Sequence, residues 1–223
     1  MDWMAGRRGF LWPKAAVVLL AAVVALMLGA EMGQAAAKIK LAALGDSITA
    51  GLGVKVEEAY PARLQALLAA KGIEAEIANA GVSGDTAADG LDRLDWSVPD
   101  GTDGVILALG ANDMLRGLEP KQTAATLDKI LTALQARKIQ VLLVGMKAST
   151  NFGESFRAAF NKMYPDLAAK HGLDLYPFLL QDVARDPALN QSDGIHPNPK
   201  GAARIAERML PSVLKLIESI GKQ

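Results

Sequence analysis

The chain has 223 residues, no cysteine, and 24 basic against 24 acidic side chains. Without cysteine it forms no disulfide, no thiolate nucleophile and no Cys-ligated zinc or iron–sulfur site. The net charge is zero and there is no cluster of basic residues, so the sequence gives no sign of a surface that would bind nucleic-acid phosphates. Histidine occurs only as His171 and His196, so a His-rich metal site is excluded and an imidazole base has two candidates.

The first 37 residues have the pattern of a secretory signal peptide. Arg7, Arg8 and Lys14 precede the uncharged run Ala15–Ala30, and an A-x-A pattern closes the segment at residues 35–37. The run is shorter than the ~20 residues that span a bilayer, so we expect cleavage rather than an anchor, and no stable membrane insertion afterwards. We therefore expect a periplasmic or secreted protein. The arginine pair also fits a twin-arginine signal, which leaves the export route open.

Residues 38–223 are predicted to form a single domain. They contain no internal repeat, no low-complexity tract and no linker. A chain of this length buries roughly 70% of its unfolded surface around one core, so neither a partner subunit nor a metal is needed for stability. We expect a monomer.

Periodicity predicts five strands and at least four helices in alternation. Short apolar runs predict strands at Ile39–Leu44, Ala75–Ala80, Val105–Leu109, Val141–Val144 and Leu173–Tyr176. Helical spacing of apolar residues predicts helices at Pro61–Lys71, Thr123–Arg137, Phe156–Lys170 and Pro199 to about Ile220, the last with Asn198 as its N-cap. This alternation predicts an α/β fold in three layers, α/β/α, with a parallel sheet in the middle. In such sheets the ligand lies beyond the carboxyl ends of the strands.

Three of the predicted strands are followed by residues with the chemistry of acyl transfer. Ser47 follows the first strand, where a turn into a helix exposes its hydroxyl and its own N–H. Gly81 follows the second strand and offers an amide, and Asn112 follows the third and offers a carboxamide donor. Each has a simpler alternative, because Ser47 also fits a helix cap, Gly81 a turn glycine and Asn112 a turn residue.

The segment before the last helix supplies a base. Asp193 precedes His196 by three residues, a spacing that lets one turn bring the carboxylate and the imidazole together. Pro197 biases His196 away from helical geometry, so its ring is expected on a rigid loop. His196 is then the candidate base toward Ser47, oriented by Asp193. His171, beside Gly172 at a predicted helix end, fits instead a surface residue near a helix C-terminus with no catalytic part.

Taken together, these blocks resemble the SGNH (GDSL) hydrolases. The resemblance rests on Gly45-Asp46-Ser47, Gly81, Gly110-x-Asn112-Asp113 and Asp193-x-x-His196, in order along the whole mature chain. It is greatest for the small periplasmic branch of arylesterases, acyl-CoA thioesterases and lysophospholipases. The resemblance implies a flavodoxin-like sheet of order 2-1-3-4-5, a Ser47–His196–Asp193 triad, and an oxyanion hole formed by Ser47, Gly81 and Asn112. It implies no metal and no organic cofactor.

The predicted activity is hydrolysis of a small ester or thioester through an acyl-enzyme on Ser47. Met114, Leu115 and Phe152 are candidates for an apolar acyl groove, although they also fit core positions. Residues 145–153 lack the prolines usual in this branch, which makes chain-length preference the weakest inference from the resemblance. Two alternatives are a glycan O-deacetylase of the same superfamily and a secreted binding module with a decayed site.

Overall fold

The computed structural model describes Met1 and residues 38–222. The predicted signal peptide lies outside these residues. Five parallel strands form one sheet in the order β2-β1-β3-β4-β5, which confirms the predicted topology. The strands are β1 (Ile39–Gly45), β2 (Ala75–Gly81), β3 (Gly104–Ala108), β4 (Gln140–Val144) and β5 (Asp174–Tyr176).

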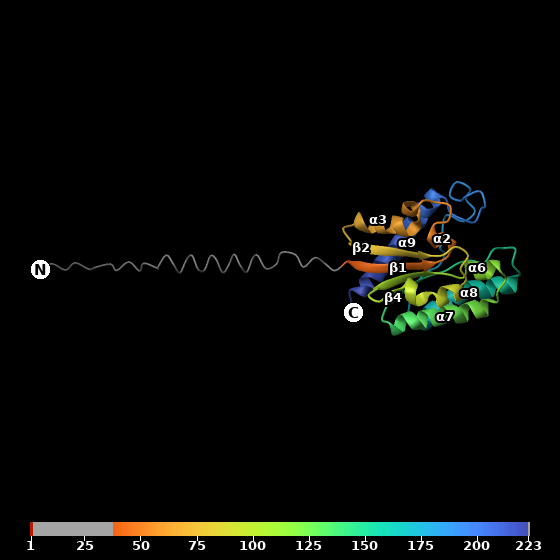
Figure 1. Ribbon diagram of the computed structural model, residues 1–223, viewed down its shortest axis with the longest axis horizontal. Helices are drawn as coiled ribbons and strands as arrows, with labels where there is room; N and C mark the ends of the chain where they lie inside the picture. The colour runs from red at the N-terminus through yellow and green to blue at the C-terminus, as the bar shows by residue number, and fades with distance from the viewer. Residues whose placement is uncertain (2–37, 223) are drawn as a thin grey trace. The chain divides into compact units, whose positions relative to one another are not determined.

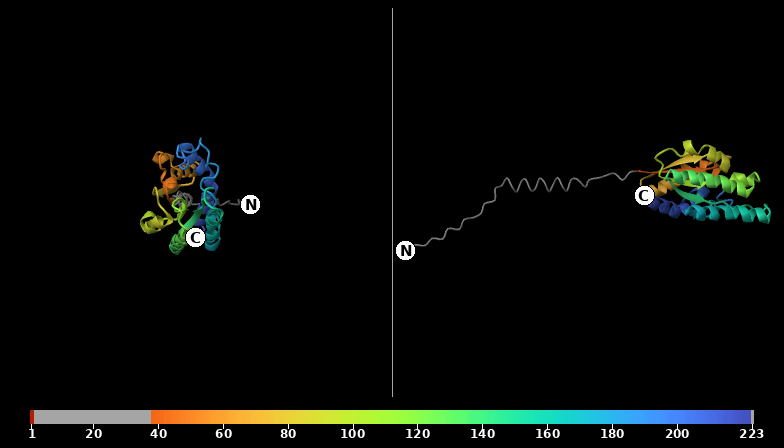
Figure 2. Two further views of the ribbon diagram at one scale, coloured as in Figure 1. Left: turned by 90° about the vertical axis from the view of Figure 1, so that its right-hand side faces the viewer. Right: turned by 90° about the horizontal axis from the view of Figure 1, so that it is seen from below.

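Helices cover both faces of this sheet, as Figures 1 and 2 show. One face carries α3 (Tyr60–Ala69) and α9 (Pro199–Ile220), which pack against each other, and the other carries α7 (Pro120–Ala136) and α8 (Glu154–His171). Strand β3 is buried along its whole length because both of its faces are covered. The shorter elements are α2 (Ser47–Ala50), η1 (Val56–Glu58), α4 (Ala87–Asp92), α5 (Leu94–Ser97) and α6 (Ala111–Leu115).

The long helices begin and end close to the predicted residues. Helix α9 begins as expected, with the Asn198 side chain accepting hydrogen bonds from the N–H groups of Lys200 and Gly201 and with Pro199 at the first helical position. Helix α7 begins at Pro120, three residues before the predicted start, because proline also suits the first turn of a helix.

The strand register aligns the carboxyl ends of β1, β2 and β3. Gly45 at the end of β1 pairs with Gly81 on one side and with Ala108 on the other. The chain therefore leaves β1, β2 and β3 at the same edge of the sheet. Ser47, the loop after β2 and the turn that carries Asn112 all follow this edge.

Candidate active site

The turn after β1 presents Ser47 at the start of a helix. Asp46 is the N-cap of α2, and its carboxylate accepts a hydrogen bond from the N–H of Ile48 at 3.0 Å. Gly45 is required at the end of the strand, because a Cβ there would lie 2.0 Å from the hydroxyl oxygen of Thr49. Ser47 is 9% exposed, and among the described residues its N–H has no hydrogen-bond partner. Both its hydroxyl and its amide are thus available at the sheet edge.

The three predicted triad residues are joined by hydrogen bonds. The Oγ of Ser47 lies 2.9 Å from Nε2 of His196, and Nδ1 of His196 lies 2.7 Å from Oδ2 of Asp193. Since the carboxylate only accepts, Nδ1 carries a proton, and Nε2 is free to accept the serine proton. The structure therefore brings together side chains that are 149 residues apart in the sequence.

Asp193 is held as a carboxylate by its own loop. Its Oδ1 accepts the backbone N–H groups of His196 at 3.0 Å and Ile195 at 2.9 Å. These bonds and the contact with the imidazole lower the pKa of Asp193 to about 2, with the His196 backbone N–H as the largest cause. Asp193 is therefore ionised at neutral pH and accepts the Nδ1 proton of His196.

Gln191 fixes the histidine loop to the serine turn, a role that the sequence analysis did not identify. Its N–H donates to the carbonyl of His196 at 2.8 Å, and its side-chain amide donates to the carbonyls of Leu52 at 2.7 Å and Pro197 at 3.0 Å. Leu52 lies just after α2. The separation of Ser47 and His196 is therefore set by backbone contacts as well as by their own hydrogen bond.

Gly81 has a different environment from the one predicted. Its N–H donates to the side-chain oxygen of Asn79 at 3.0 Å, so this amide is already engaged. A Cβ at Gly81 would lie 2.2 Å from the backbone nitrogen of Ala50, which explains why glycine stands where β2 passes α2. The structure thus gives Gly81 a packing role and offers no free oxyanion donor at this residue.

Asn112, on α6, contacts the loop after β2, which carries a second glycine, Gly84. Its side-chain nitrogen donates to the carbonyl of Asp85 at 2.9 Å, which leaves the second N–H of this amide for another acceptor. Gly84, the residue before Asp85, has φ +92°, and its carbonyl accepts from Arg116 at 2.7 Å. Among the described residues, the N–H of Gly84 donates no hydrogen bond. A glycine at or shortly after the end of a strand is a common turn signal, so the sequence alone did not distinguish Gly84 from Gly81.

Asp46 has a buried carboxyl group with a raised pKa. It is 3% exposed, and its burial is the largest cause of a pKa raised to about 6. The hydrogen bond from Ile48 and the nearby His196 lower this pKa, whereas the carboxyl groups of Asp85 and Asp113 raise it further. Asp46 thus braces the serine turn at an electrostatic cost.

The predicted acyl-groove residues separate into core and surface. Met114 is 6% exposed and belongs to the hydrophobic core, as the simpler alternative for it implied. Leu115 is 54% exposed on α6, three residues after Asn112. Phe152 is partly buried and stacks on Phe156 with ring centroids 4.9 Å apart. Leu115 and Phe152 are therefore the two candidates whose side chains keep exposed surface.

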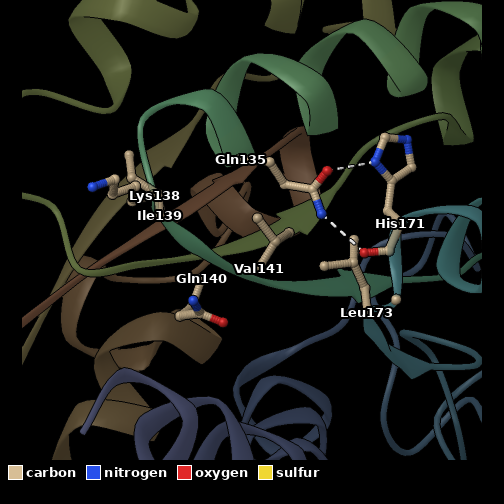
Figure 3. A pocket seen from close by; sticks show the side chains of 8 residues that line it. Gln135, Lys138, Ile139, Gln140, Val141, His171 and Leu173 are labelled. Carbon is tan, nitrogen blue, oxygen red and sulfur yellow. Dashed lines mark hydrogen bonds between the residues drawn. The ribbon is translucent and has the colours of Figure 1, made fainter. Parts of the chain in front are cut away.

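A hollow of about 410 Å³ lies at the other edge of the sheet, where β4 begins at Gln140. Figure 3 shows His171 in its wall, with hydrogen bonds that connect this residue to Gln135. The hollow contains none of the predicted site residues. His171 also lies 2.6 Å from Asp128, so it joins α7 to α8; its side chain is only 6% exposed, whereas the sequence predicted a surface residue.

Two further features bear on the class of protein. Within residues 38–222, no three His, Asp or Glu side chains are grouped so that they could hold a metal ion. None of the helices in this described part of the chain is both long and apolar enough to cross a bilayer.

Comparison with known proteins identifies close relatives. Residues 43–204 match the model of the GDSL-like Lipase/Acylhydrolase family. Esterase TesA of Pseudomonas aeruginosa is 35% identical over 90% of this chain and 98% of its own length. The thioesterase 1/protease 1/lysophospholipase L1 of Escherichia coli strain K12 is 36% identical over 82% of this chain and 88% of its own. The crystal structure of AlinE4, an SGNH-hydrolase family esterase, is 42% identical with a TM-score of 0.69, covering 83% of this chain and 98% of that one.

Proposed function

Because the chain belongs to the GDSL-like lipase/acylhydrolase family, we propose that it hydrolyses carboxylic esters and thioesters through an acyl-enzyme on Ser47. The observation that carries this proposal is the hydrogen-bonded series Ser47–His196–Asp193, with distances of 2.9 and 2.7 Å. This geometry supplies a nucleophile, a general base and a carboxylate that stabilises the imidazolium.

The proposed reaction has two halves. His196 Nε2 takes the proton from Ser47 as its Oγ forms a bond to the carbonyl carbon, and the carbonyl electron pair moves to the oxygen. The tetrahedral intermediate then expels the alcohol or thiol, which receives the proton from His196. A water molecule, deprotonated by the same imidazole, then attacks the acyl carbon; the bond to Ser47 Oγ breaks, His196 returns the proton to Oγ, and the carboxylic acid is released.

The proposed oxyanion hole consists of the Ser47 N–H, the Gly84 N–H and the side-chain amide of Asn112. Gly84 replaces Gly81 in this assignment for two reasons. The Gly81 N–H already donates to Asn79, whereas the Gly84 N–H is free among the described residues. Gly84 also precedes Asp85, whose carbonyl accepts a hydrogen bond from Asn112. Preorganised donors of this kind lower the barrier because they meet charge that develops only in the transition state.

The proposed substrates are small acyl esters and thioesters, with Leu115 and Phe152 facing the acyl chain. The esterase and thioesterase relatives support this class. We propose that the active form is a monomer. We also propose that residues 1–37 direct export and are then removed, so that the active form begins near Lys38. The basis is the charged start and the apolar run of this segment.

The test is covalent labelling combined with kinetics. Ser47→Ala and His196→Ala should each remove nearly all turnover of p-nitrophenyl esters at an unchanged melting temperature, and the double variant should be little worse. Ser47→Ala should also lose labelling by a fluorophosphonate. Ser155→Ala, at an exposed serine of α8, and His171→Ala are the matched controls that should keep full turnover. Retained labelling of Ser47→Ala would overturn the proposal.

A further inference from the structure

Arg93 places a charged group inside the protein close to the proposed site. It follows α4, is 8% exposed, and is the only lysine or arginine among the buried residues of the described chain. Its guanidinium donates three hydrogen bonds, to Asp85 Oδ2 at 2.5 Å, to Ser97 Oγ at 2.8 Å and to the carbonyl of Gly45 at 2.9 Å. All three kinds of guanidinium nitrogen are thus used.

The partners of this guanidinium belong to two different turns of the site. Gly45 ends β1 two residues before Ser47, and its carbonyl also accepts the N–H of Val82 at 3.1 Å. Asp85 directly follows Gly84, and its backbone carbonyl holds the side chain of Asn112. One planar group therefore connects the serine turn with the loop that carries Gly84, and through the Asp85 peptide with Asn112.

Buried acidic residues lie close to the partners of Arg93. Asp46 and Asp113 are buried near Asp85, since both Asp85 and Asp113 raise the pKa of Asp46. Asp113 is tied to the backbone N–H of Ala87 at 2.8 Å and to the hydroxyl of Thr123 at 3.1 Å. A buried charge costs several kcal/mol unless it is paired and hydrogen-bonded. In the observed arrangement the guanidinium is paired with Asp85 and hydrogen-bonded through all three of its nitrogens.

We propose that Arg93 is a positioning residue that sets the spacing between the Ser47 amide and the Gly84 and Asn112 donors. It touches no substrate atom. It acts by binding the Gly45 carbonyl and the Asp85 carboxylate with one guanidinium, which fixes the two turns relative to each other. This inference rests on the proposed function, because the spacing matters only if these three groups bind one oxyanion.

Arg93→Lys is the decisive variant. Lysine keeps the positive charge, but its ammonium is a point charge and does not reproduce three bonds from a planar fork. We expect kcat to fall by about 10- to 100-fold, less than the loss of a whole donor, with KM changed by less than about threefold. The inhibition constant of an alkyl trifluoromethyl ketone, whose serine adduct carries an oxyanion, should rise by the same factor as kcat falls.

A matched arginine distinguishes positioning from stability. Arg137 follows α7 at the opposite edge of the sheet, where it bonds the carbonyl of Val98 and pairs with Asp100. Arg137→Met should lower the melting temperature but leave kcat and ketone affinity at wild-type values. Arg93→Met should lower both the melting temperature and kcat. If the methionine variant of Arg93 does not fold, the lysine variant decides alone.

The outcomes separate the two proposals. Wild-type kcat and ketone affinity in folded Arg93→Lys, with Ser47→Ala inactive and unlabelled, would overturn the role of Arg93 and leave the proposed function standing. A loss of kcat in Arg137→Met equal to that in Arg93→Lys would also overturn it, since stability would then explain both. Labelling of Ser47→Ala by the fluorophosphonate would instead refute the proposed function, and the positioning role with it.

Discussion

Replacing Asp46 by asparagine should stabilise the protein at neutral pH but not in acid. Asparagine keeps an oxygen that accepts the Ile48 N–H, so the N-cap of α2 survives the change. It removes only the charge. Burial is the largest cause of the raised pKa of Asp46, and the ionised carboxyl is therefore less stable in the folded protein than in the unfolded chain.

The size of the effect follows from proton linkage. The pKa of Asp46 rises from its ordinary 3.8 to about 6, so the folded state binds this proton more tightly. Below pH 3.8 the carboxyl is protonated in both states and costs nothing. The cost develops between pH 3.8 and 6 and is complete above pH 6, where it reaches about 3 kcal/mol. For a domain of this size that corresponds to a rise in melting temperature of about 6–12 °C in the asparagine variant.

The assay is urea unfolding of the wild type and Asp46→Asn at pH 4.0 and pH 7.5, followed by circular dichroism. The asparagine variant should have the larger free energy of unfolding at pH 7.5, and the difference should shrink to about 0.5 kcal/mol at pH 4.0. Asp92→Asn, at the exposed end of α4, should show no such dependence on pH. A variant that is no more stable than the wild type at pH 7.5, or equally stabilised at both pH values, would refute the reasoning.

Three further predictions concern catalysis, specificity and processing. Asn112→Ala should lower kcat by about 10²–10³-fold with little change in KM, whereas lost stability with near-normal kcat would assign Asn112 to the turn alone. For the wild type, kcat/KM on p-nitrophenyl esters should rise from acetyl to hexanoyl or octanoyl, since each buried methylene contributes about 0.8 kcal/mol, and Phe152→Ala should flatten this rise. A wild-type profile that peaks at acetyl would favour the glycan deacetylase instead. Mass spectrometry of exported protein should find an N-terminus within two residues of Lys38, and an intact Met1 on membrane-bound protein would favour an anchor.

The layered fold could be predicted because its signals are local. Strands covered on both faces read as mostly apolar runs, and β1 begins at Ile39 as predicted and ends one residue later. Helix α9 shows its cap and its first-turn proline directly in the sequence. The short helices α4, α5 and α6 were not predicted, since four to six residues are too few to show a periodic apolar face.

The parts of the site that could not be predicted depend on pairing between distant segments. Gly81 and Gly84 look equally suitable in the sequence, and only the side chain of Asn79 shows which amide is engaged. Arg93 lies at the polar end of a helix. It is buried because its guanidinium contacts the carbonyl of Gly45, which ends β1 48 residues earlier in the chain. Gln191 likewise acts on Leu52 across 139 residues. Such contacts leave no periodic pattern along the chain.

The distance along the chain between Ser47 and His196 has a consequence for biosynthesis. A ribosome releases residue 47 long before residue 196, and 149 positions separate the serine from its base. The imidazole also depends on a loop that is closed by the first residues of α9. On the proposed function, a growing polypeptide has no working nucleophile until nearly the whole chain has been made and folded. Truncated products of translation should then show no esterase turnover, and the appearance of turnover should mark the completion of folding.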